Sequence, residues 1–428
     1  MKILTIGGGG REHAIIKKLS ESKKISKIYA APGNGGIADM ATCTGISAGD
    51  FDGIVDFSIS NAIDLVVVAP DNPLVDGLVD LLASKGIRAW GPDKKAAIIE
   101  GSKGFSKALM KKYGIPTAKY EIFNSESDAK DYIVKNNRYP TVIKADGLAL
   151  GKGVIIANNE EEALAAVHSI MSDKIFGESG SEIVIEEFLT GTEVTVLSFT
   201  DGKTIVPMIS STDHKRAKDG DLGLNTGGMG VIAPNPLYTT EVADICMKTI
   251  FMPTINAMRS EGRAFKGCLY FGLMLTNDGL KVIEYNCRFG DPEAQAVLPL
   301  LKTDLLEIFE ATIDERLDEI NIAFENNHSC CVIIASGGYP EKYNTGYPIF
   351  GLDKVSGKDV FVYHAGTKID GENYLTNGGR VLCVQAKAEN LADAILNAYS
   401  ATEKISFTDC YYRKDIGKPA LTILGGSS

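Results

Sequence analysis

The sequence predicts a multidomain protein of α/β and α+β class. A doubly wound α/β unit comes first, antiparallel β-sheet with interposed helices follows, and a small β-rich unit comes last. The chain has 428 residues, a length that suggests about three domains. Strand and helix signals alternate up to about residue 100, hairpin signals dominate from about 104 to 320, and mainly strand signals follow about residue 325. The composition, with 44% hydrophobic and 23% charged residues, is that of an ordinary globular protein.

The N-terminal unit shows the alternation of strand and helix that is typical of a doubly wound fold. A β-branched run at 65–69 is expected of a parallel strand that helices cover on both faces. The expected elements are, in chain order, a strand at 3–6, a helix from Arg11, a strand at 28–30, the strand at 65–69 and a helix from Pro73 to Gly86.

Four consecutive glycines, Gly7 to Gly10, join the first strand to the first helix. They do not form a dinucleotide fingerprint, because the third glycine of that pattern would fall on Glu12 or His13. The second strand also ends without an acid for a ribose. The loop is either a tight turn or a phosphate site made of N–H groups at a helix N-terminus, and we favour the phosphate site.

The middle and last regions carry the signals of antiparallel sheets. Asn277-Asp278-Gly279 between two apolar runs is a strong hairpin signal, and a glycine loop is expected at 147–153. The other expected elements of the middle region are helices at 105–113 and 160–171 and strands at 141–145, 154–157, 183–188, 193–199, 268–275 and 280–286. The last region is expected to hold strands near 330–335, 360–365 and 380–386 and a helix near 391–404.

The most informative segment runs from Glu284 to Gln295, Glu-Tyr-Asn-Cys-Arg-Phe-Gly-Asp-Pro-Glu-Ala-Gln. If 280–286 is a strand, its period of two places Glu284 and Asn286 on one face. Two hard oxygen donors on a rigid strand suit Mg2+, which takes one or two protein oxygens together with nucleotide phosphates. An edge strand with solvated polar residues is the alternative. A guanidinium follows at Arg288, and then a sharp turn.

Three lysines are candidates for contact with phosphates, because lysine is a compact point charge. Lys144 ends a buried strand, where an unpaired ammonium would be costly unless an anion meets it. Lys152 lies in the glycine loop, and Lys103 starts a helix after Gly101-Ser102. Solvent exposure is the alternative for each lysine, and we favour phosphate contact for Lys144.

The segment Ile185-Glu186-Glu187-Phe188-Leu189 has the features of an adenine clamp. An extended strand offers backbone donors and acceptors to the base, apolar side chains such as Leu189 flank it, and a carboxylate accepts from its amino group. Glu193, just beyond, could accept both ribose hydroxyls. Without the other signals, the segment would be an ordinary acidic strand.

Residues 213–230 lack helix or strand periodicity. A loop of this length in a compact protein is usually functional or disordered, and its mixed charges favour a function. Its glycines allow the backbone to approach a ligand closely. His214 could act as an acid or base, or it could only orient the segment.

The composition argues against several classes of protein. A net charge of -11 does not suit a general nucleic-acid or anionic-membrane binder, although anionic small substrates need only local cations. No apolar stretch reaches membrane-spanning length, and the start lacks the regions of a signal peptide. The eight cysteines include no C-x-x-C pair, so a reduced, cytoplasmic protein is expected. The neighbours of Cys287 favour packing over a nucleophilic role.

Over nearly its whole length the chain resembles the phosphoribosylamine–glycine ligase (glycinamide ribonucleotide synthetase) family of the ATP-grasp superfamily. The motifs that carry the resemblance are Gly7–Ala14, Ala31–Gly35, Ala69–Leu74, Ile143–Ala149, Asp213–Gly230 and Glu284–Gln295. The resemblance implies a Rossmann-like (pre-ATP-grasp) domain at 1–103, a two-lobed ATP-grasp domain at 104–322 with a lid lobe at about 119–190, and a C-terminal β-rich domain at 323–428.

The resemblance also implies roles for individual residues. Glu284 and Asn286 would hold Mg2+, for which Mn2+ can substitute; most ATP-grasp enzymes have two acids there, whereas this family carries the asparagine. The residues implied at the nucleotide are Lys103, Lys144, Lys152, Glu186, Glu187, Leu189 and Glu193. Those implied at the acceptor site are Gly9, Asp213, Arg288, Gly290 and Asp291, with Arg288, Asp213 and Lys144 as the catalytic set.

The implied reaction joins glycine to 5-phosphoribosylamine with ATP and gives glycinamide ribonucleotide, ADP and phosphate. Phosphorylation of glycine creates an acyl phosphate with a good leaving group, so the protein mainly positions the substrates and neutralises charge. Another ATP-grasp carboxylate–amine ligase and a non-catalytic nucleotide-binding protein are the rival hypotheses. The expected partners are small molecules, with no nucleic acid or membrane, and the expected form is a monomer without fused pathway enzymes.

The strand pattern predicts that Glu284→Gln is the most damaging change at the metal site. Loss of metal stabilisation worth about 3 kcal/mol or more would lower kcat at least about a hundredfold. The spacing alone predicts that Asn286→Asp, which keeps an oxygen, is milder. Steady-state rates over a range of Mg2+ concentrations check both, and full activity of Glu284→Gln at limiting Mg2+ would contradict the metal assignment.

Overall fold

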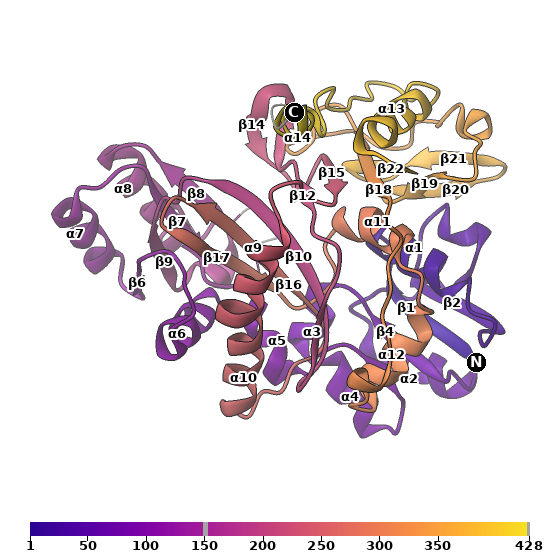
Figure 1. The fold of residues 1–428 in the computed structure, drawn as a ribbon, viewed down its shortest axis with the longest axis horizontal. Coiled ribbons are helices and arrows are strands. Elements are labelled where there is room, and N and C mark those ends of the chain that lie inside the picture. The colour runs from indigo at the N-terminus through magenta and orange to yellow at the C-terminus, as the bar shows by residue number, and fades with distance from the viewer. Residues whose placement is uncertain (149–152, 426–428) are drawn as a thin grey trace.

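A five-stranded parallel sheet, in the order β3-β2-β1-β4-β5, forms the N-terminal part of the computed structural model, which describes residues 1–148 and 153–425 (Figure 1). This confirms the predicted doubly wound unit. Its strands are β1 (Lys2–Gly7), β2 (Lys27–Pro32), β3 (Thr42–Cys43), β4 (Leu65–Val68) and β5 (Ala89–Trp90). Its helices are α1 (Gly10–Leu19), α2 (Phe51–Ser60), α3 (Asp71–Asp76), α4 (Leu78–Ser84) and α5 (Lys94–Gly101).

The single helix predicted from Pro73 to Gly86 is wrong. The structure has two helices, and the first begins at Asp71, before the proline. Gly77 takes a φ of 96°, in the left-handed region that glycine adopts readily, and this ends α3 before α4 begins.

Two four-stranded sheets form the middle of the molecule, in the orders β6-β9-β7-β8 and β11-β10-β16-β17. The first sheet and its helices lie at the left in Figure 1 and comprise β6 (Tyr120–Phe123), α7 (Glu126–Asn136), β7 (Thr141–Ala145), β8 (Val154–Ala157), α8 (Glu160–Met171) and β9 (Ile183–Glu187). The second sheet comprises β10 (Thr192–Asp201), β11 (Ile205–Pro207), β16 (Lys266–Thr276) and β17 (Gly279–Asn286). The predicted strands at 141–145 and 154–157 and the helix at 160–171 are confirmed.

Helix α6 (Lys103–Tyr113) contacts both of these sheets, through β9 and β17, and also contacts α10 (Met252–Ser260). Ser102 caps its N-terminus by accepting a hydrogen bond from the Phe105 N–H. Gly114 in the left-handed region ends it, as the sequence predicts. Two further helices, α11 (Glu293–Val297) and α12 (Leu305–Ile313), follow β17.

The segment 213–230 is more regular than the sequence predicts. It contains an antiparallel pair, β13 (Arg216–Lys218) and β14 (Leu222–Asn225), between β12 (Thr212–Asp213) and β15 (Gly230–Ala233). The buried Arg413 donates to the Arg216 carbonyl at 3.1 Å and to the Asp221 carboxylate at 2.8 Å. A distant arginine therefore holds this hairpin, and its strands are too short for a periodic pattern.

The C-terminal unit is a five-stranded sheet in the order β12-β15-β18-β22-β19. Two of its strands come from residues 212–233, so this unit and the middle of the chain share one sheet. Its other elements are β18 (His328–Ala335), β19 (Val360–His364), β22 (Arg380–Ala388), α13 (Leu391–Thr402) and α14 (Lys418–Gly425), with a separate pair β20 (Thr367–Asp370) and β21 (Asn373–Thr376). In the described part of the chain, no helix has both the length and the apolarity needed to cross a membrane.

Candidate active site

The end of strand β17 presents Glu284 and Asn286 on one face. Glu284 pairs with Gly272 and Val282 with Leu273, so the strand has an irregularity at Ile283. A regular strand would put Val282 on the face of Glu284, but the irregularity places it in the hydrophobic cluster that contains Tyr285. The two polar side chains thereby emerge beside each other from a strand whose other face is packed.

Four cations surround the carboxylate of Glu284. Burial opposes its ionisation, yet Lys215, Lys144, Lys103 and Arg288 together lower the pKa of Glu284 below its ordinary value. The ammonium of Lys215 lies 3.8 Å from the carboxylate. Glu284 is therefore held as an anion in a positive environment, which suits a site for a metal together with phosphates.

The neighbours of Asn286 determine which way its amide points. Its nitrogen can donate to the Glu100 carboxylate at 3.0 Å and to the Tyr285 carbonyl at 3.2 Å, which turns the amide oxygen away from Glu100. Within residues 1–148 and 153–425, no group of three or more His, Cys, Asp or Glu side chains could hold a metal. Two protein oxygens, from Glu284 and Asn286, fit Mg2+ that takes its remaining ligands from phosphates and water.

Lys144 is buried and forms an ion-paired group with Glu186 and Lys107. Its ammonium lies 3.0 Å from one oxygen of Glu186, and the ammonium of Lys107 lies 3.0 Å from the other. Lys144 also donates to the Ile283 carbonyl of β17 at 3.3 Å. Glu186 thus fixes Lys144 next to β17, and two lysines already pair with its carboxylate.

The other residues predicted at the nucleotide are distributed around this group. Lys103 donates to the Gly147 carbonyl at 2.9 Å, and burial lowers its pKa although Glu284 opposes that shift. Glu187 pairs with Lys281 at 3.0 Å, and Glu193 is exposed and pairs with Lys215 at 2.9 Å. Leu189 is partly buried just after β9. Lys152 and the centre of the predicted glycine loop lie outside the described residues.

Asp213 and Glu293 form an acidic pair beside the cations. Burial and then Glu293 raise the pKa of Asp213 well above its ordinary value, although Lys215 opposes the shift. Burial also raises the pKa of Glu293. The Oδ1 atom of Asp213 is buried and has no hydrogen-bond partner in the described part of the chain. The pair would be stabilised by an added positive charge, such as a substrate ammonium.

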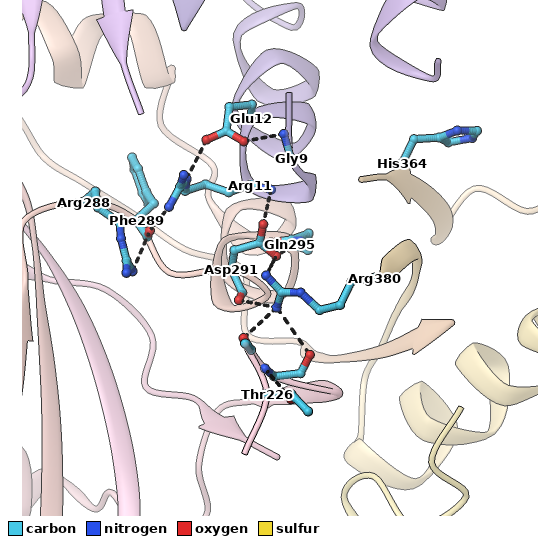
Figure 2. A network of polar contacts seen from close by, with 12 residues as sticks. Gly9, Arg11, Glu12, Thr226, Arg288, Phe289, Asp291, Gln295, His364 and Arg380 are labelled. Carbon is cyan, nitrogen blue, oxygen red and sulfur yellow. Dashed lines mark hydrogen bonds and ion pairs between the residues drawn. The ribbon is translucent and has the colours of Figure 1, made fainter. Parts of the chain in front are cut away.

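A polar network holds the turn that follows β17 (Figure 2). The carboxylate of Asp291 accepts from the Arg11 N–H at 3.3 Å and from Gln295 at 2.9 Å, and it pairs with Arg380 at 3.3 Å. Arg380 also donates to the carbonyls of Gly227 and Asp291, both at 2.6 Å. Figure 2 shows this guanidinium between Asp291 and the backbone next to Thr226. The network therefore links α1 of the N-terminal unit and β22 of the C-terminal unit to the turn that is predicted to line the acceptor site.

The glycine loop contacts this turn closely. A Cβ on Gly9 would lie 3.2 Å from the Asp291 carboxylate, and one on Gly10 would lie 2.3 Å from the Gln295 amide nitrogen. The Gly9 N–H donates to Glu12 at 2.7 Å. Protein carboxylates therefore already accept from the N–H groups of Gly9 and Arg11, which a phosphate would have to displace.

The environment of His214 favours the hypothesis that it orients its segment. Its Nδ1 lies 3.1 Å from the Gly230 carbonyl, and its Nε2 accepts from the Gly417 N–H at 3.2 Å. Burial lowers the pKa of this imidazole, which keeps it neutral. Cys287 is also buried, and burial raises the pKa of its thiol well above the ordinary value, in agreement with a packing role.

Four charged residues of the site were not predicted from the sequence: Glu100, Lys107, Lys215 and Glu293. Lys107 lies four residues after Lys103 on α6, and this helical spacing could have indicated it. Lys215 and Glu293 lie inside motifs that were recognised, but nothing local separates them from their neighbours. Glu100 has no local signal, because its partners follow it by 186 to 188 residues.

Family models cover most of the chain. The phosphoribosylglycinamide synthetase N domain matches residues 1–100, the ATP-grasp (A) domain of the same synthetase matches 101–294, and its C domain matches 329–419. A phosphoribosylamine–glycine ligase from Caldanaerobacter subterraneus subsp. tengcongensis is 47% identical over 97% of this chain and 99% of its own. The trifunctional purine biosynthetic protein adenosine-3 of Gallus gallus is 45% identical over 100% of this chain and 43% of its own.

Solved structures show the same similarity. The crystal structure of phosphoribosylamine–glycine ligase from Thermotoga maritima has a TM-score of 0.83 at 30% sequence identity and covers 97% of this chain and 100% of its own. The biotin carboxylase domain of Hydrogenobacter thermophilus 2-oxoglutarate carboxylase has a TM-score of 0.73 at 18% identity, over 96% of this chain and 91% of its own. The second similarity concerns the fold alone.

The buried Lys107 is expected to make stability depend on pH. Burial lowers its pKa from 10.5 to about 8 in the folded protein. Between these values the unfolded chain binds more protons, so the free energy of unfolding should rise with pH, by at most about 1.4 kcal/mol per pH unit. Urea unfolding between pH 8 and 10 should show a shallower rise for Lys107→Met. Lys111→Met, an exposed lysine of the same helix, is the control; equal slopes for wild type and Lys107→Met would refute the assignment.

Proposed function

The chain belongs to the phosphoribosylglycinamide synthetase family, and from that premise we propose which of its residues carry out the reaction. The reaction is the ATP-dependent ligation of glycine to 5-phosphoribosylamine in purine biosynthesis, and it yields glycinamide ribonucleotide, ADP and phosphate. One observation supports our assignment most strongly. Glu284 and Asn286 emerge side by side next to Lys103, Lys144, Lys215 and Arg288, so the proposed metal ligands lie beside cations that suit phosphates.

We propose three domains, at 1–103, 104–322 and 323–428, with a lid lobe at about 119–190. The matched ranges of the family models, with a break after residue 100, support this division. The lid lobe corresponds to the sheet of β6, β9, β7 and β8 with α7 and α8. ATP would then bind between this sheet and β17, where Lys144 already connects the two.

At the nucleotide, Lys103 and Lys144 would contact the phosphates. Lys107 and Glu186 would hold Lys144 in place, which is why three buried charges occur together. Adenine would bind along the strand end from Glu186 to Leu189, using backbone groups and the flank of Leu189, and Glu193 would accept from the ribose. The roles of Glu187 and Lys152 at the nucleotide remain predictions from the sequence.

The metal would be held by Glu284 and Asn286, through one carboxylate and one amide oxygen. Bound Mg2+ or Mn2+ would neutralise charge on the transferred phosphoryl group. The surrounding ammonium groups would orient the same phosphate, so that the glycine carboxylate and the γ-phosphorus meet in line. The product of this step would be glycyl phosphate, an acyl phosphate. Its phosphate is a good leaving group, whereas the oxide of a free carboxylate is not.

Glycine would be recognised at both of its ends. Its ammonium fits the acidic pair of Asp213 and Glu293, whose charge the described residues leave incompletely balanced. Its carboxylate fits Arg288, because the Nε of this buried guanidinium has no partner among the described residues. Glycine would then lie between the acidic pair and the metal, with its carboxylate toward the phosphate.

Phosphoribosylamine would approach from the turn that carries Gly290 and Asp291, next to Gly9. Its amine attacks the acyl carbon, and phosphate departs with the bonding electron pair. The proton that the amine then loses can pass to the departing phosphate, while Asp213 and Glu293 stay paired with the glycine ammonium.

Turnover with defined substrates tests the proposed function. ADP release is expected with ATP, Mg2+, glycine and freshly generated phosphoribosylamine, and omission of either co-substrate should reduce it to background. An equal rate with another carboxylate in place of glycine would favour a different ATP-grasp ligase. The absence of turnover with the complete mixture would favour a nucleotide-binding protein without activity.

Asp213→Asn tests the acidic pair. A charge-assisted hydrogen bond to the substrate ammonium is worth about 1.5 to 3 kcal/mol, so the KM for glycine should rise about tenfold or more. The KM for ATP should change less than twofold, because the nucleotide binds elsewhere in the site. Asp219→Asn, an exposed acid of the same segment, is the matched control. An unchanged KM for glycine in Asp213→Asn would remove the residue from the glycine site.

A further inference from the structure

The carboxylate of Glu100 contacts three consecutive residues of the segment from Asn286 to Asp291, which is the proposed catalytic segment. Glu100 lies in the last turn of α5, and its side chain is 6% exposed. One of its oxygens accepts from the Cys287 N–H at 2.8 Å. The other accepts from Arg288 at 2.8 Å and lies 3.0 Å from one end of the Asn286 amide, which must be the nitrogen because Glu100 and the Tyr285 carbonyl, both acceptors, face it. All of these contacts are donors, so the pocket that surrounds Glu100 requires an acceptor at both oxygens.

We infer that Glu100 is a positioning residue that aims the oxygen of Asn286 at the metal and makes asparagine the residue required at position 286. This inference rests on the proposed metal role of Asn286. An amide has two different ends, and Glu100 accepts only from the nitrogen end. The oxygen end is therefore turned toward the site before any ligand binds.

The same contact explains why an acid is unsuitable at position 286. An aspartate there would place a carboxylate within hydrogen-bonding distance of the buried Glu100, and neither group could donate as long as both are ionised. Like charges at this distance oppose each other strongly where water is largely excluded. Arg288 cannot remove the conflict, because it is already shared between Glu100 and Asp71, which lies 3.6 Å from it. Asn286→Asp should therefore be more damaging than the strand spacing alone predicts.

Glu100 is well placed for this role because the residues after it are also fixed. The Ser102 hydroxyl and the Gly104 N–H donate to Asp146 at 3.2 and 2.6 Å. Lys103 donates to the Gly147 carbonyl at 2.9 Å. The short segment from Glu100 to Gly104 thus contacts the end of β17 and the residues after it through Glu100, and it contacts Gly147 through Lys103. Its position sets the distance between the proposed metal ligands and a proposed phosphate ligand.

A double-mutant cycle tests the inference, with Glu100→Gln, Asn286→Asp and the combination of both. Each single variant places like groups face to face, two donors in the first and two acceptors in the second. In the double variant, the nitrogen of the introduced glutamine can donate to the new carboxylate while its oxygen accepts from the Cys287 N–H. Arg288, which then has no acceptor at that position of residue 100, can pair with the new carboxylate. We expect each single change to lower the urea midpoint in EDTA, and the double variant to unfold at a higher urea concentration than Asn286→Asp.

The metal readout is the affinity for Mn2+ in the presence of ADP, measured by electron paramagnetic resonance. The double variant should bind Mn2+ about tenfold more tightly than Asn286→Asp alone, a coupling within the usual range for contacting residues. Asn286→Ser is the uncharged comparison, and Glu100→Gln should not improve its affinity. Glu325→Gln combined with Asn286→Asp is the matched control, because Glu325 contacts Asn327 and Lys387 away from this segment.

Additive effects in the metal-free unfolding cycle would overturn the inference, as would a double variant that folds no better than Asn286→Asp. Failure of the metal assignment would give a different result. In that case the unfolding cycle would still show coupling, but Glu284→Gln would bind Mn2+ with wild-type affinity. Coupling in EDTA together with weakened Mn2+ binding in Glu284→Gln supports both proposals.

Discussion

The site depends on one constraint: the segment from Asn286 to Asp291 carries groups that must be paired, and their partners come from distant parts of the chain. Glu100 and Arg11 reach it from the N-terminal part, and Arg380 reaches it from the C-terminal sheet. A buried charge that loses its partner is strongly destabilising. The folded arrangement of the three parts and the geometry of the catalytic segment are therefore coupled, and neither can change alone at low cost.

Much of the fold was predictable because local pattern determines it. The helix Glu160–Met171 and the strand Thr141–Ala145 have the predicted bounds, since an N-cap and an apolar repeat define them within a few residues. The helix break at Gly77 and the hairpin at Arg216–Asn225 were missed. The hairpin is held by Arg413, almost 200 residues away, so its short strands show no pattern of their own. A contact between residues so far apart cannot be inferred from a short stretch of sequence.

The residues of the candidate site also fall into those that could be predicted from the sequence and those that could not. The motif that contains Glu284 and Asn286 was recognisable, because its residue types have a direct chemical meaning on a strand. The lysines and acids that tune it were less visible, because a charge such as Lys107 looks like a solvated residue until the fold pairs it with Glu186. The phosphate site expected at Gly7–Gly10 stays a prediction, but the loop also has packing contacts that the sequence does not show. Gly9 and Gly10 pack closely against Asp291 and Gln295, and Gly8 packs against the backbone of Gly33; only the assembled structure reveals these contacts.

Trp90 gives this arrangement an optical reporter. It is the only tryptophan in the chain, and its buried ring stacks on Phe309 at 4.0 Å and on Phe289 at 5.5 Å between centroids. Phe289 lies between Arg288 and Gly290 in the catalytic segment. The tryptophan emission of the protein therefore comes from one indole, which packs against Phe289, next to Arg288, a residue proposed to bind substrate. Ligand-driven movement of that segment can be followed without a label and with no background from a second indole.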